Sequence, residues 1–330
     1  MLHEDREFFA QLVLRTAEAK AILPSIIEKD YYVTEYLRAF FLSQPNAVFK
    51  GGTSLSKCYH VIDRFSEDID LNIDCDARLS EGQRKQLKRN IVSAFAKISA
   101  IPTNLGETRS RRDFNRYLAD YSSVIEDDFL RRRLMVETMV SMRSFPCETK
   151  PVSSFVSDYL LGNGFENIVC QHGAGSFPVK VQAIERTFVD KTFALCDYYL
   201  TGRVAEHSRH LYDLYKILPL IRFDDTFYTL VEQVRMERAP HTVCPSAAVR
   251  GSAISVIKEI IANAAYREDY EKITIPLLFT PVPYDLAVSV LSDIVSSHMF
   301  SWQPLRGLPS VQKERRFPLP LFQPIRSPDK

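Results

Sequence analysis

The sequence has few cysteines, and none of them is spaced for a metal site or a disulfide framework. Its 330 residues contain six cysteines, which lie far apart with no CxxC pair. Structural zinc sites need closely spaced thiolates, and disulfide-stapled scaffolds are short and cysteine-dense. These cysteines therefore indicate reduced thiols, as in a protein of the cytoplasm.

A long hydrophobic run is also lacking. The most apolar stretch, Ile254 to Ala265, is interrupted by Lys258 and Glu259, so it falls short of the ~20 apolar residues that a membrane-spanning helix requires. The charged N-terminus, Met-Leu-His-Glu-Asp-Arg-Glu, has no apolar signal-peptide core. We expect a cytoplasmic protein with no membrane partner.

Neither sign of charge dominates. The chain carries 42 basic and 41 acidic residues, a net charge of +1, so the field of the whole molecule will not attract a polyanion. Local basic clusters do occur, and each fits a solvated helix face as well as a nucleic-acid contact. The clusters are Arg84, Lys85, Lys88 and Arg89, then Arg109, Arg111, Arg112 and Arg116, then Arg131 to Arg133.

The length and the hydrophobic pattern predict more than one structural unit. At 330 residues the chain exceeds the usual size of one domain, and its 45% hydrophobic content supplies ample core material. Periodicity predicts helices over 4–22, from Pro24 onward and over 80–98, and strands at 47–49, 69–73, 134–140 and 179–181. We expect an N-terminal helical segment (1–45), a core (46–183) with an insertion at about 102–128, a helical domain (184–300) and a proline-rich tail (301–330).

The most informative stretch combines a glycine pair with an Asp-x-Asp motif. Gly51-Gly52 follows a short strand and is expected to form a turn, with Thr53 or Ser54 capping the next helix. Such a turn offers backbone N–H groups to a phosphate. The motif does not match the GxxxxGK[ST] phosphate-binding loop, which occurs nowhere in the chain.

Asp68 and Asp70 alternate with apolar residues in the next strand, so both project from the same face. Two convergent carboxylates suit a pair of magnesium ions that catalyse phosphoryl transfer. An isolated Asp-x-Asp is more often solvated charge, and an isolated Gly-Gly-Thr-Ser is usually a simple turn. In strand–turn–helix–strand order, however, the two together form a specific pattern.

These motifs resemble the AbiEii/AbiGii toxin family, whose members are polymerase-beta-like nucleotidyltransferases of bacterial toxin–antitoxin systems. The resemblance rests first on Gly51 to Leu55 and Ser66 to Leu71. Further segments agree with other family motifs, and the likeness runs discontinuously from about residue 26 to 295. These segments are Ile27 to Thr34, Asp190 to Leu195, Arg209 to Leu214 and Tyr266 to Tyr270.

The resemblance implies roles for individual residues. Asp68 and Asp70 would bind Mg²⁺ or Mn²⁺, with Glu137 as the third carboxylate. Lys191 would hold the triphosphate and Asp213 would complete the pocket. Phosphate binding would also involve Gly51, Gly52, Thr53, Ser54 and Lys57.

Ordinary structural roles are open for the same residues. Lys191 fits the exposed face of an amphipathic helix, Asp213 an ion pair with Arg209 one turn earlier, and Glu137 a solvent-facing strand position. His207 and His210 have i, i+3 spacing, but they lack a third nearby ligand and are interpreted as packing or surface residues.

The resemblance implies an α+β nucleotidyltransferase core with a small mixed sheet and a mostly helical C-terminal domain. It further implies transfer of a nucleoside monophosphate from an NTP to an acceptor hydroxyl. RNA is the first expectation for the acceptor, with the 3′ end of tRNA one candidate and a protein hydroxyl the alternative. A cognate antitoxin is the expected protein partner. Two other classes stay open: a nucleotide-binding regulator without transfer activity, and a nucleic-acid-binding module with a vestigial Asp-x-Asp.

Overall fold

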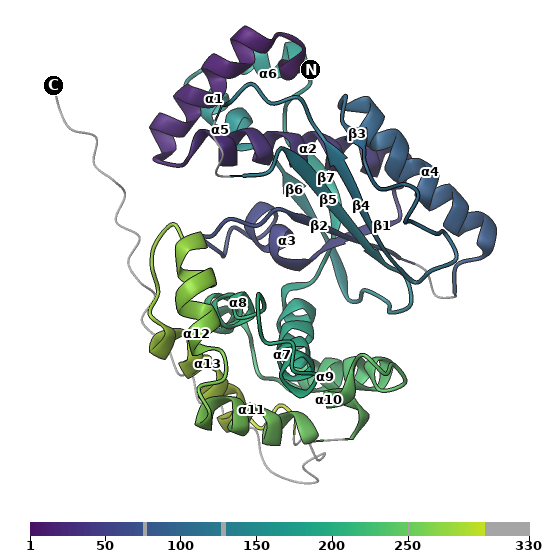
Figure 1. The fold of residues 1–330 in the computed structure, drawn as a ribbon, viewed down its shortest axis with the longest axis vertical. Coiled ribbons are helices and arrows are strands. Elements are labelled where there is room, and N and C mark those ends of the chain that lie inside the picture. The colour runs from purple at the N-terminus through teal and green to yellow at the C-terminus, as the bar shows by residue number, and fades with distance from the viewer. Residues whose placement is uncertain (75–77, 127–129, 250, 301–330) are drawn as a thin grey trace, which may run out of the picture.

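The computed structural model describes residues 1–74, 78–126, 130–249 and 251–300. Two bodies are visible in Figure 1, a sheet with helices above it and a helical group below it. The proline-rich tail expected at 301–330 lies outside the described residues. No described helix has both the length and the apolar character needed to cross a membrane.

A seven-stranded mixed sheet forms the centre of the first body, in the order β3-β4-β5-β2-β1-β7-β6. The β5–β2 and β1–β7 pairs are parallel and the other neighbouring pairs are antiparallel. The strands are β1 Ala47–Lys50, β2 Asp68–Ile73, β3 Ile101–Pro102, β4 Phe114–Asp120, β5 Arg133–Met139, β6 Cys147–Val152 and β7 Phe177–Gln182.

The two faces of the sheet have different partners because the side chains of β2 alternate. Ile69, Leu71 and Ile73 join one hydrophobic core with the N-terminal helices. This core includes α1 (Arg6–Lys20), α2 (Pro24–Ser43) and α4 (Glu81–Lys97). The opposite face of β2 carries its polar residues toward the helical group.

The helical group has its own hydrophobic core, built largely from α7 to α13. Its members are α7 Ile184–Leu200, α8 Arg209–Ile217, α9 Asp225–Arg238, α10 Pro245–Ala248, α11 Ser252–Ala262, α12 Arg267–Asp269 and α13 Tyr284–Ser296. The expected α+β class, a small mixed sheet followed by a mostly helical part, is confirmed.

Several elements differ from the expectation. The stretch 102–128, predicted as an insertion, contributes β4, which pairs with β5 along its whole length. The edge strand β6 and the helices α5 (Phe155–Gly162) and α6 (Glu166–His172) were not predicted. The predicted Gly51-Gly52 turn was wrong, because helix α3 (Gly51–Lys57) begins at Gly51 with Lys50 as its N-cap.

Candidate active site

Asp68 and Asp70 lie on the same face of β2, as predicted. In the register of the sheet, Asp70 lies opposite Lys50 of β1 on one side and Glu137 of β5 on the other. Each of these residues belongs to a different strand, so the backbone pairing alone places three charged side chains next to one another.

A cavity of about 270 Å³ separates this face from α7, α8 and the end of α9. Asp68 and Asp70 line its sheet side, together with Gly51 and Gly52. Its opposite wall includes Lys191 of α7 and Arg209 of α8. Segments from both bodies therefore form one cavity around the Asp-x-Asp motif.

The Asp68 carboxylate is incompletely satisfied. Its Oδ2 lies 3.3 Å from Nη2 of Arg209, whereas its buried Oδ1 has no hydrogen-bond partner among the described residues. Burial raises the pKa of Asp68, and Arg209 opposes this shift. A buried carboxylate oxygen without a donor is unfavourable unless a ligand satisfies it.

Asp70 is deeper in the cavity wall. Burial, with a further contribution from Glu137 and Asp68, raises the pKa of Asp70 to about 6, while Lys50 opposes the shift. Like charges gathered in a desolvated site disfavour ionisation, and a bound cation would reverse that preference. Asp68 and Asp70 are therefore the residues that could hold a cation.

Neighbouring side chains lie very close to Gly51 and Gly52 and leave little room for a Cβ atom at either position. Gly51 has φ +76°, and a Cβ atom there would lie 2.0 Å from Oδ2 of Asp70. A Cβ atom on Gly52 would lie 2.6 Å from Nη2 of Arg64. A side chain at either position would have to displace these groups, so the start of α3 packs directly against β2 and Arg64.

Thr53 and Ser54 do not line the cavity. Instead of capping α3, Thr53 Oγ1 donates a hydrogen bond to the carbonyl oxygen of Asp68 at 2.5 Å, and Ser54 Oγ donates to that of Gly51 at 2.8 Å. Their predicted contact with phosphate has no support in this geometry. Thr53 instead fixes α3 to the strand that carries the carboxylates.

Asp213 also lies behind the cavity wall. Its buried carboxylate accepts hydrogen bonds from Nε and Nη2 of Arg64, both at 2.7 Å, and pairs with Nζ of Lys191 at 2.7 Å. Burial alone would raise the pKa of Asp213, but Arg64 and Lys191 outweigh it and hold the pKa far below its usual range. Asp213 thus positions two cations that do line the cavity, and the alternative partner Arg209 pairs with Asp68.

Glu137 and Lys57 are placed differently from the expectation. Glu137 lies beside Asp70 in the sheet but binds Nε of Arg116 at 2.7 Å, and it does not line the cavity. The Lys57 ammonium donates to Asp30 and to Thr34, each at 2.6 Å, and faces another cavity. Within the described ranges, no three His, Cys, Asp or Glu side chains form a complete metal-ligand cluster.

The sequence did not point to Arg64 or to the role of Lys29. Lys29 forms an ion pair with Glu67, the residue before Asp68, and donates to the carbonyl oxygen of Arg131 at 3.2 Å. It therefore ties α2 to the starts of β2 and β5. The family-like segment from Ile27 to Thr34 was the available signal, although it gave no partner for Lys29.

Some residues of the three basic clusters form hydrogen bonds within the fold. Arg84 is buried and donates to Asp113 at 2.8 Å, and Lys88 donates to the carbonyl oxygen of Thr108 at 2.9 Å. The exposed members could meet a nucleic acid; they are Lys85, Arg89, Arg109, Arg111, Arg112, Arg116, Arg131 and Arg132.

The chain is similar to several solved structures and matches one family model. A search of curated proteins finds no match. Similar solved structures include JHP933 from Helicobacter pylori (18% identity, TM-score 0.41, covering 81% of this chain and 90% of that one). They also include the nucleotidyltransferase toxin MenT4 from Mycobacterium tuberculosis (17% identity, TM-score 0.46, covering 89% of this chain and 90% of that one).

A family model described as nucleotidyl transferase AbiEii toxin, of type IV toxin–antitoxin systems, matches residues 35–290. The match spans the sheet with its Asp-x-Asp motif, the glycine pair, Lys191 and Asp213, and it covers well over half of the chain. The chain therefore belongs to the AbiEii family of nucleotidyltransferase toxins.

Proposed function

We propose that this nucleotidyltransferase moves a nucleoside monophosphate from an NTP to a hydroxyl group of RNA, with Mg²⁺ held by Asp68 and Asp70. The observation that carries the proposal is the state of these two carboxylates. They share one strand face in a cavity, one buried oxygen has no donor among the described residues, and burial raises both pKa values.

The donor set fits magnesium. Mg²⁺ commonly takes one or two protein carboxylates and completes its coordination with water and substrate phosphates, so a third protein ligand is not required. Mn²⁺ accepts the same hard oxygen ligands. A bound metal ion would neutralise charge on the reacting phosphate and orient it. Glu137 would contribute from the neighbouring strand only after leaving Arg116.

Cationic side chains around the carboxylates supply the phosphate-binding part of the proposal. Lys191 and Arg64 are fixed by Asp213 and present their charges at the cavity. Arg209 is held near Asp68 by its ion pair. Because these groups are already positioned, little ordering is needed when a triphosphate binds.

The charge balance of the cavity favours RNA over a protein as the acceptor. Its lining contains seven lysine or arginine residues and three aspartates, and three carboxylates behind the wall (Asp197, Asp213 and Glu237) pair with four of the cations. A small positive excess is left. A triphosphate and an acceptor phosphate together would complement this excess, whereas a protein hydroxyl brings no negative charge. The 3′ end of tRNA is one acceptor with this chemistry. The cations are Lys50, Arg64, Arg143, Arg186, Lys191, Arg209 and Arg238, and the aspartates are Asp68, Asp70 and Asp190.

The proposal includes a biological consequence. Modification of an essential RNA would arrest growth, so the chain would require a cognate antitoxin, in agreement with the family to which it belongs. We expect expression of the intact chain to stop bacterial growth and co-expression of the antitoxin to restore it.

The test is incubation of the protein with Mg²⁺, total bacterial RNA and total bacterial protein, using each NTP labelled at its α-phosphate. We expect the label to become covalently attached to RNA. Label on protein would overturn the choice of acceptor. Nucleotide binding without any transfer would overturn the catalytic proposal and favour a regulatory function.

A further inference from the structure

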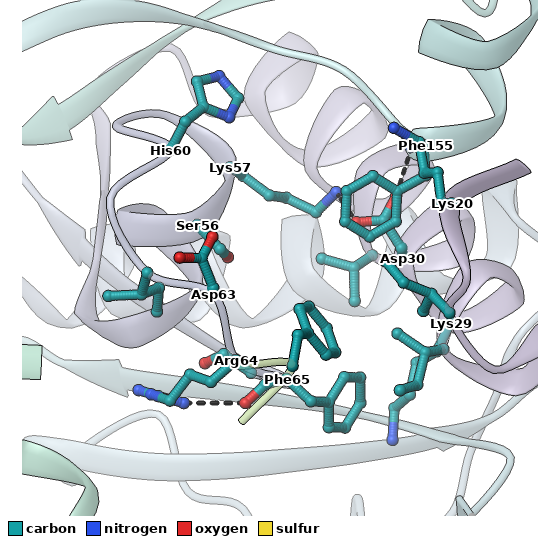
Figure 2. Close-up of a pocket in the computed structure, with 16 residues that line it drawn as sticks. Lys20, Lys29, Asp30, Ser56, Lys57, His60, Asp63, Arg64, Phe65 and Phe155 are labelled. Carbon is teal, nitrogen blue, oxygen red and sulfur yellow. Dashed lines mark hydrogen bonds and ion pairs between the residues drawn. The ribbon is translucent and has the colours of Figure 1, made fainter. Parts of the chain in front are cut away.

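A second cavity, of about 300 Å³, lies directly behind one wall of the catalytic cavity. Arg64 and Ser66 line both cavities, so the segment that contains them separates the two. The second cavity lies beside α2, the loop after α3 and the start of α5, and includes Phe279 of the helical group. Figure 2 shows its labelled side chains.

The separating segment is a short extended stretch that pairs with the backbone of residues 277–279. Phe65 N donates to the carbonyl oxygen of Leu277 at 3.1 Å, and Phe279 N donates to that of Asp63 at 2.9 Å, on either side of a bridge between Arg64 and Leu278. Side chains alternate along such a stretch. Arg64 accordingly reaches Asp213, while Asp63 and Phe65 turn to the second cavity.

The lining of the second cavity is rich in aromatic rings. Phe65 and Phe155 are half-buried, and the Phe279 residue, which also lines the cavity, is 42% exposed. The aliphatic side chains of Ile26 and Val33 form part of its buried lining. Rings that are accessible on one side offer flat surfaces for a planar ligand.

Most charges in this cavity are already paired. Lys57 binds Asp30, Lys29 binds Glu67 with its ammonium 5.8 Å from the ring centre of Phe65, and Asp63 binds Lys216. The exposed Lys20 is different, because its ammonium lies 5.2 Å from the ring centre of Phe155 and has no carboxylate partner in the described part of the chain. The exposed His60 belongs to the same lining. Among the described lining residues, the unpaired charge in this cavity is therefore the positive charge of Lys20, which lies beside the ring of Phe155.

We propose that this cavity binds one unpaired base of the RNA acceptor, stacked on Phe155, with the adjoining phosphate contacted by Lys20. The inference rests on the proposed RNA acceptor. Aromatic faces combined with free cations are the chemistry that recognises single-stranded nucleic acid. The shared wall provides the connection, since an RNA strand held in the second cavity lies one extended segment away from Asp68.

The test measures binding of a short fluorescein-labelled single-stranded RNA of mixed sequence, without NTP. Phe155→Leu keeps an apolar side chain but removes the ring, and we expect affinity to fall about tenfold. Lys20→Gln should weaken binding and reduce the slope of log affinity against log salt by about 0.7. The matched controls are Phe165→Leu, an exposed ring elsewhere, and Lys97→Gln, another exposed lysine at the end of a helix.

A second readout is the KM in the transfer assay, where KM for RNA should rise in the two cavity variants while KM for NTP stays constant. If both cavity variants match their controls while the wild-type protein still binds and labels RNA, the inference is wrong and the proposed function stands. An equal loss of affinity for duplex RNA, or loss of free nucleoside monophosphate binding alone, would also overturn it. If the wild-type protein binds no RNA, both proposals fail. Lys20→Gln keeps the test decisive if Phe155→Leu unfolds, because Lys20 is exposed.

Discussion

Arg64 and Asp213 form a two-pronged ion pair across 149 positions of sequence, with both N–O distances at 2.7 Å and neither side chain more than 2% exposed. The pair joins the segment before β2 to α8, and so connects the sheet with the helical group. Because Lys191 binds the same carboxylate, one buried aspartate holds two cations at the cavity that contains Asp68 and Asp70.

Asp213→Asn should therefore destabilise the protein strongly. It leaves the buried Arg64 without its counter-charge, a change that typically costs about 3–5 kcal/mol of unfolding free energy. Urea unfolding measures the effect, with Asp293→Asn on the exposed side of α13 as the control. A loss of less than about 1 kcal/mol would mean that the pair contributes little to the fold.

Gly51→Ala should inactivate the enzyme beyond its effect on stability. A positive φ costs an alanine about 1 kcal/mol, and the added Cβ must also displace the Asp70 carboxylate. Gly164→Ala is the matched control, because Gly164 has φ +77° and a Cβ atom there would meet no described atom within 4 Å. Gly164→Ala reports the cost of the positive φ alone, and Gly51→Ala should lose more stability because Asp70 must also move. Activity of the folded protein should fall about 10²-fold in Gly51→Ala alone. Equal activity in the two variants would argue against the close approach.

Asp70→Asn should stabilise the metal-free protein at neutral pH. The folded pKa of Asp70 is about 6, above its usual value of 3.8, so between these values the folded state binds more protons than the unfolded state. Stability of the wild type therefore falls as pH rises from about 4 to 6 and then stays level. The Asn variant lacks this pH-dependent loss and should be more stable at pH 7 by about 3 kcal/mol. Thermal unfolding in EDTA at several pH values checks this, and a pH-independent difference would contradict it.

Lys191→Ala should weaken NTP binding more than NMP binding, by about tenfold in the ratio. A fixed ammonium group meets the negative charge of the β- and γ-phosphates, which NMP lacks. The fold should survive, because Arg64 remains on Asp213. Titration with both nucleotides measures the ratio, and equal losses would return Lys191 to a purely structural role.

Local patterns in the sequence were sufficient for the features that local physics controls. Alternation of polar and apolar residues placed Asp68 and Asp70 on one face of β2, and a proline in the first turn marked the start of α2. The edge strand β6 escaped prediction because its sequence, Cys-Glu-Thr-Lys-Pro-Val, is polar and contains a proline. Only its pairing with β7 makes it a strand.

Features that depend on distant residues could not be read from spacing. The alternative structural role for Asp213 paired it with Arg209 one helical turn away, yet its partners are Arg64 and Lys191. Lys57 follows the glycine pair along the chain, but Asp30 holds its ammonium on another side. In both examples a buried charge pairs with a residue that is distant in the sequence. Local sequence patterns do not predict such pairs.

We propose that Asp68 and Asp70 together support metal-dependent transfer to RNA. The most direct measurement is covalent labelling of total RNA from α-labelled NTP by the wild-type, Asp68→Asn and Asp70→Asn proteins, with Mg²⁺ and with EDTA. We predict transfer by the wild type with Mg²⁺ alone, and a loss of about 10²-fold or more in both variants, since each loses an anionic ligand while keeping its shape. Near-wild-type labelling by both folded variants, or unchanged labelling in EDTA, would contradict the account.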